Sequence, residues 1–62
     1  MGRYKYGEFV IYQDPESNNK ECIGKVVSYD EKSDKYTLIM QQGVGGTRHQ
    51  ISESELKPFK NN

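Results

Sequence analysis

The chain has 62 residues, which is enough for one domain and too short for a second hydrophobic core. Nine Lys and Arg residues balance nine Asp and Glu residues, and this zero net charge disfavours strong non-specific nucleic-acid binding, which needs clustered positive charge. The hydrophobic fraction is only 32%, so we expect any binding site to be shallow and built on the surface.

The two ends of the chain are polar. Residues 1–6, MGRYKY, interleave basic side chains with tyrosines. One interpretation is an arm whose rings stack on bases or pack against a partner. The other is an extension of the first strand, in which Tyr4 and Tyr6 cover the open end of the core. Residues 60–62 form a polar tail.

Five segments have the alternating pattern and the β-branched or aromatic content of short strands. They cover residues 7–13, 21–30, 36–41, 47–51 and 56–59. Val10 and Tyr12 share one face of the first strand, and we expect that face to line the core. Ile39 breaks the alternation in the third strand and predicts partial burial on both sides. Gly24 predicts a bulge or a sharp bend in the second strand.

The connections between these segments carry turn residues. Residues 14–20, DPESNNK, form a long polar loop of the kind that rims binding surfaces, and residues 30–35 form a tight turn. Residues 42–46, QGVGG, predict a glycine-rich hairpin connection. Residues 52–55, SESE, have capping-box spacing and predict one short 3-10 turn before the last strand. The pattern predicts a single all-β domain over residues 1–62, built as a small five-stranded barrel.

Four motifs at core and turn positions point to a known architecture. They are Gly7-Glu8-Phe9-Val10, Gly24-Lys25-Val26-Val27-Ser28-Tyr29-Asp30, Tyr36-Thr37-Leu38 and Ile51-Ser52-Glu53-Ser54-Glu55-Leu56-Lys57-Pro58. Through these motifs residues 7–58 resemble the Tudor and related SH3-like barrel domains, and the resemblance implies a five-stranded SH3-like barrel. Core and turn positions report the fold much more than the function.

Tudor domains that bind methylated lysine or arginine hold the cation in a cage of aromatic rings. The resemblance places three of the usual cage positions at Asp14, Cys22 and Met40, none of which is aromatic. A different cage would need Tyr12, Tyr29 and Tyr36, but strand parity assigns Tyr12 and Tyr36 to the core. The sequence therefore disfavours binding of a methyl mark.

A few residues are also shared with the plasmid-encoded type II dihydrofolate reductases, in which four copies form one central pore. The shared residues are Gly7 with Val10, Gly24 with Val26, and the Gln50-Ile51 pair. That family carries a Lys near the end of its first strand and a Tyr after the Gln-Ile pair. Gln13 and Ser52 stand at these places in this chain. An oligomeric enzyme of this type is an alternative that lacks the expected binding groups.

Catalytic and metal chemistry have little support in the sequence. His49 is the only histidine and Cys22 the only cysteine, and no pattern brings them together as base and nucleophile or as part of a metal cluster. The lone cysteine excludes an internal disulfide, and no apolar run approaches the roughly 20 residues that span a bilayer. We expect no catalytic, metal or cofactor site, and an intracellular protein that is cytoplasmic or, in a eukaryote, nuclear.

The sequence favours a small non-enzymatic binding module that docks on a protein partner and modulates it. The candidate partner-binding residues are Tyr4, Tyr6, Asp14, Glu16, Asn18, Val44, Arg48 and His49. An alternative is weak nucleic-acid binding through a local basic and aromatic face. The candidate residues for that alternative are Arg3, Lys5, Lys25, Lys35 and Arg48.

Overall fold

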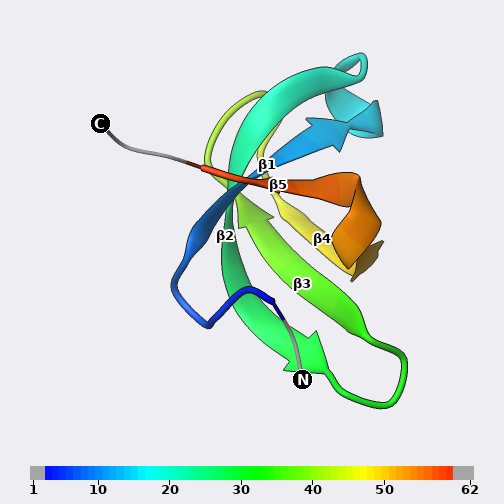
Figure 1. Ribbon diagram of the computed structural model, residues 1–62. Helices are drawn as coiled ribbons and strands as arrows, with labels where there is room; N and C mark the ends of the chain where they lie inside the picture. Colours follow the sequence, from blue (N-terminus) through cyan, green and yellow to red (C-terminus); the bar gives the residue numbers. More distant parts are fainter. Residues whose placement is uncertain (1–2, 60–62) are drawn as a thin grey trace.

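The computed structural model describes residues 3–59, so residues 1–2 of the predicted arm and the predicted tail at residues 60–62 lie outside the described residues. The elements are β1 (Phe9–Asp14), η1 (Pro15–Ser17), β2 (Lys20–Asp30), β3 (Lys35–Met40), β4 (Thr47–Ser52), η2 (Glu53–Glu55) and β5 (Leu56–Pro58), where η marks a 3-10 turn (Figure 1). The five predicted strands and the helical turn before the last one are confirmed, with small shifts at their ends. The part of the chain described here contains no helix long and apolar enough to cross a membrane.

All strand pairs are antiparallel, and the strands follow the order β4-β3-β2-β1-β5 in one sheet. The first half of β2 pairs with β1 and the second half pairs with β3. Figure 1 shows β2 curving strongly between these two partners. The all-β class is therefore confirmed. Backbone hydrogen bonds do not close the sheet into a barrel, because β4 and β5 remain as its two edges.

The irregularities of the sheet differ from those expected from the glycines. The register of β2 against β3 shifts between Val26 and Ser28, so the bulge predicted at Gly24 lies further along the strand. Gly24 instead permits close approach, because a Cβ there would lie 3.2 Å from Leu38 Cδ1. A second register shift lies in the pairing of β3 with β4, between Tyr36 and Leu38. In the matching part of β4, Gln50 adopts a left-handed conformation with φ of 60°.

The core lies on one face of the curved sheet, where alternate residues of each strand are buried. Val10 and Leu38 are completely buried, and Tyr12 is 5% exposed, as the alternation predicted. Ile39, in contrast, is 43% exposed. The partial burial predicted for the outer face of β3 is found at Lys35 and Thr37, which are half-buried, but not at Ile39.

Three tyrosines close the core at the end of the sheet nearest the N-terminus. Tyr4 is buried and packs edge-on against Tyr36, with 5.7 Å between ring centroids, and its backbone amide donates to the Tyr36 hydroxyl at 3.2 Å. Tyr29 packs against the same ring at 4.8 Å. The hydroxyl of Tyr29 donates to Asp34, and this hydrogen bond, with burial adding to it, raises the pKa of Tyr29 to about 12. Tyr4 thus covers the core, whereas Tyr6 is 78% exposed.

Candidate functional site

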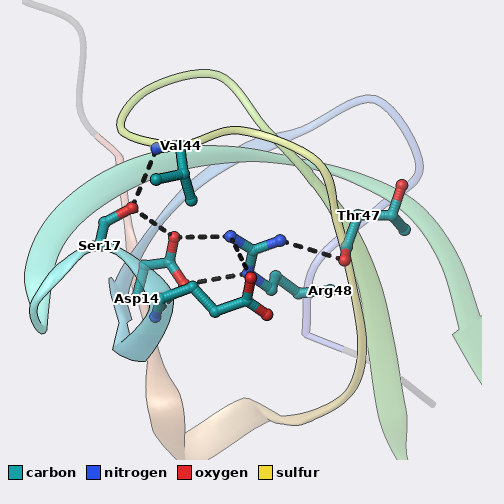
Figure 2. A network of polar contacts seen from close by, with 6 residues as sticks. Asp14, Ser17, Val44, Thr47 and Arg48 are labelled. Atoms are coloured by element: carbon teal, nitrogen blue, oxygen red, sulfur yellow. Dashed lines mark hydrogen bonds and ion pairs between the residues drawn. The ribbon is translucent and has the colours of Figure 1, made fainter.

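A buried ion pair joins the end of β1 to the start of β4. Asp14 is fully buried, and Arg48 is 8% exposed. Nε and Nη2 of Arg48 donate to the two carboxylate oxygens of Asp14, each at 3.0 Å (Figure 2). This two-point geometry is the strong form of the arginine–carboxylate contact. Because β1 and β4 are not neighbours in the sheet, the ion pair bridges a gap that no backbone ladder closes.

Asp14 also begins the turn that follows β1. Its Oδ1 accepts from the backbone amide of Glu16 at 3.2 Å, and its Oδ2 accepts from the hydroxyl of Ser17 at 2.9 Å. Pro15 occupies the first position of η1, where the missing amide is not needed. The hydrogen bond from Arg48 is the main cause that lowers the pKa of Asp14, and it outweighs the burial that acts to raise it.

Ser17 extends the network to the second loop. Its hydroxyl donates to Asp14 and accepts from the backbone amide of Val44 at 3.1 Å (Figure 2). Gly43 allows this approach, because it has φ of 70° and a Cβ there would collide with the Ser17 hydroxyl and lie 3.2 Å from Cys22 Sγ. The network therefore fixes residues 15–19 and 42–46 against each other.

Three predicted partner-binding residues are exposed on these two loops, and we call them the loop-end surface: Glu16, Asn18 and Val44. Val44 is 67% exposed although its amide is tied down. Glu16 lies at 3.7 Å from Arg48 Nη2, with 67% of its side chain exposed. Asn18 ends η1 in the left-handed conformation, with φ of 59°. The loop-end surface thus combines an apolar, an acidic and an amide side chain on a fixed backbone.

The other predicted partner-binding residues lie apart from this surface or beneath it. Asp14 and Arg48 are the buried supports of the loops. His49 follows Arg48 and is exposed on β4. Tyr4 and Tyr6 belong to the segment at the opposite end of the sheet, where Tyr4 is part of the core.

The five basic residues predicted for nucleic-acid binding are distributed over the arm and three strands. The guanidinium of Arg3 lies 5.6 Å from the centre of the Tyr4 ring, and Lys5 is exposed nearby in the chain. Lys25 is half-buried on β2. Lys35 Nζ donates to Ser52 Oγ at 2.5 Å, and the charge of Arg48 is compensated by Asp14. The set does not form one continuous row on a single strand.

Two residues that fix the loops were not among the predicted site residues. Ser17 had a recognisable signal, because Asp-Pro followed by a serine is a favourable start for a helical turn. Gly43 had none beyond its place in a glycine-rich loop. A shallow pocket of about 210 Å³ was also not predicted, and it lies between β1, β2, η2 and β5. An exposed ion pair between Lys57 and Glu21, at 2.9 Å, stands at its rim.

Among residues 3–59 no three His, Cys, Asp or Glu side chains lie close enough together to hold a metal ion. Cys22 is buried and His49 is exposed, so they do not share an environment. Comparisons with models of protein families, with curated proteins and with solved structures find no significant match for this chain.

Proposed function

We propose that the chain is a non-enzymatic binding module that docks on a protein partner through the loop-end surface and modulates that partner. The observation that carries this proposal is the hydrogen bond from Val44 to Ser17, supported beneath by Asp14 and Arg48. Two loops that are already ordered lose little conformational entropy on binding. Val44 can therefore serve as an exposed apolar anchor between polar neighbours.

The architecture supports a module of the SH3-like, Tudor-like class. We infer this from the strand order, from the long β2 that is shared between two partners, and from the 3-10 turn between β4 and β5. In this interpretation the Asp14–Arg48 pair takes the place of a closing ladder at one end of the sheet. Loops at the rim of such small β folds are the usual carriers of binding function.

Affinity capture from the native host tests the proposal. The tagged chain is compared with a double variant, Val44→Ser with Glu16→Gln, which alters the loop-end surface, keeps Asp14 and Arg48 in place and puts no new positive charge beside Arg48. We expect a co-purifying protein that the wild type retains and the double variant loses. The matched control is Lys57→Ser, which changes an exposed residue on β5 and leaves the loops intact.

Two results would contradict the proposal. One is a captured protein that the double variant retains in full. The other is affinity for RNA or DNA at low ionic strength that is abolished by Arg3→Glu with Lys5→Glu, because phosphate contacts are strongest at low salt. That second result would assign the binding function to Arg3 and Lys5 of the N-terminal arm.

A further inference from the structure

The outer face of the sheet carries apolar side chains in a row, with one lysine between them. Phe9 of β1 and Ile39 of β3 both stand directly opposite Lys25 of β2. Each of the three has at least one sequence neighbour that is buried in the core, so its own side chain points to the other face. Phe9 is 42% exposed, Ile39 is 43% exposed and Lys25 is half-buried. This row crosses the three central strands.

A second apolar row lies beside the first. Ile11 of β1 is paired with Ile23 of β2, and both are half-buried. Ile11 also lines the shallow pocket next to β5, so the surface is hollowed at that side. We call these five residues the outer-face patch: Phe9, Ile11, Ile23, Lys25 and Ile39. An apolar patch of this kind around a charged group is typical of an interaction surface.

The charges on this face indicate which partner fits it. Lys57, which borders Ile11, is neutralised by Glu21 at 2.9 Å. Lys25 forms no ion pair with any residue between 3 and 59. A carboxylate brought to Lys25 by a partner would be shielded from water by Phe9 and Ile39, which strengthens the attraction. A partner must therefore supply an acid with apolar groups around it.

Other occupants fit less well. In a symmetric dimer through this patch, the Lys25 residues of two copies would approach each other and repel. A nucleic acid gains affinity from several cations along its backbone, and this patch offers one. We propose that the outer-face patch binds a protein segment in which an Asp or Glu is flanked by apolar side chains.

This site is separate from the loop-end surface, and it does not rest on the function proposed for those loops. The loop-end surface is held by the Asp14–Arg48 network at the ends of the strands, whereas the outer-face patch lies on the middle of β1, β2 and β3. Substitutions can therefore remove one site and leave the other. Val44→Ser serves as the control for the patch.

Selection from a random library of linear peptides displayed on phage tests this inference. The immobilised full chain is the target, and the variants Lys25→Glu and Ile39→Thr are used to measure the selected peptides. We expect enriched peptides with Asp or Glu between apolar residues, and a loss of about tenfold or more in affinity for either variant. Val44→Ser should bind them as the wild type does. Circular dichroism checks that each variant is folded.

Three outcomes would overturn the inference. The first is enrichment of basic or wholly polar peptides, or no enrichment over an uncoated surface. The second is an acidic and apolar consensus whose binding is unchanged in both folded variants. The third is a concentration-dependent dimer in solution that Ile39→Thr dissociates, because the occupant of the patch would then be a second copy of this chain.

Discussion

At the loop end of the sheet Asp14 and Arg48 hold β1 against β4, whereas at the opposite end the ring of Tyr4 lies across Tyr36. The first closure is made by two opposite charges that are almost completely buried. The second is made by aromatic surface and a single hydrogen bond at 3.2 Å. Both close the same small core.

The difference matters because the two closures respond differently to change. A buried ion pair must recover the desolvation of both charges, so it tolerates the loss of neither partner. The ion pair also has a fixed geometry, and through Ser17 it positions the loop that carries Val44. Packed rings gain free energy from buried area in many orientations and need no partner of opposite charge. The loop end is therefore the closure that combines stability with positioning.

The largest expected effect comes from breaking the buried pair. Asp14→Ala leaves the buried Arg48 with only the exposed carboxylate of Glu16 nearby, and we expect a loss of about 3–5 kcal/mol in the free energy of unfolding. For so short a chain that is most of the stability. Urea denaturation followed by circular dichroism measures it.

The matched control for that experiment is Glu21→Ala, which removes the exposed pair with Lys57. Its cost should stay within roughly 1 kcal/mol, because exposed ion pairs contribute little. Equal losses from the two substitutions would mean that burial of the Asp14–Arg48 pair does not matter, and the contrast between the two ends of the sheet would disappear.

Acid should weaken the loop end selectively. The pKa of Asp14 in the folded protein is lowered below its unfolded value of about 3.9, mainly by the hydrogen bond from Arg48. Its contribution is therefore present above the unfolded pKa and is lost as the pH falls through the folded pKa. The free energy of unfolding of the wild type should approach that of Asp14→Asn between pH 5 and the acid limit of folding. A gap between the two proteins that does not narrow would contradict this assignment.

A smaller effect follows from separating the two loops. Gly43→Ala brings a methyl group against the Ser17 hydroxyl, and we expect it to lose about 1–3 kcal/mol more than Gly45→Ala. The two glycines make a matched pair, because their φ values are 70° and 75° and a Cβ at Gly45 meets nothing within 4 Å. Thermal unfolding compares them. Equal losses would show that φ alone is responsible and that the contact between the loops is dispensable.

The sequence predicted the strands and the core well, because alternation depends on neighbouring residues. Val10, Tyr12 and Tyr36 were assigned to the core and are buried. The position of the bulge along β2 was harder to predict. The bulge of β2 depends on how β3 pairs with it, so it lies after Val26 and was not marked by Gly24.

The buried ion pair beneath the candidate site was not predicted for a similar reason. Asp14 and Arg48 are 34 residues apart, and each looks like an ordinary surface charge in the sequence. Their burial arises only when β1 and β4 meet across the core. Both residues were in the predicted set together with Glu16 and Val44, because turn-rich loops are recognisable from local composition, but they were predicted as exposed contacts and not as a buried pair. Local sequence signals therefore identified residues of the site but not the buried ion pair that supports it.

The smallest expected effect lies at the aromatic end. Tyr36→Phe keeps the ring packed against Tyr4 and Tyr29 but removes the acceptor of the Tyr4 amide, and we expect a loss of about 0.5–1.5 kcal/mol. Because no group that titrates in acid takes part in this contact, the loss should be the same at pH 7 and pH 3, by urea denaturation. A loss that grows or shrinks with acid would link the tyrosines to the buried carboxylate. A constant loss would show that the contact between Tyr4 and Tyr36 is independent of the buried carboxylate at the loop end.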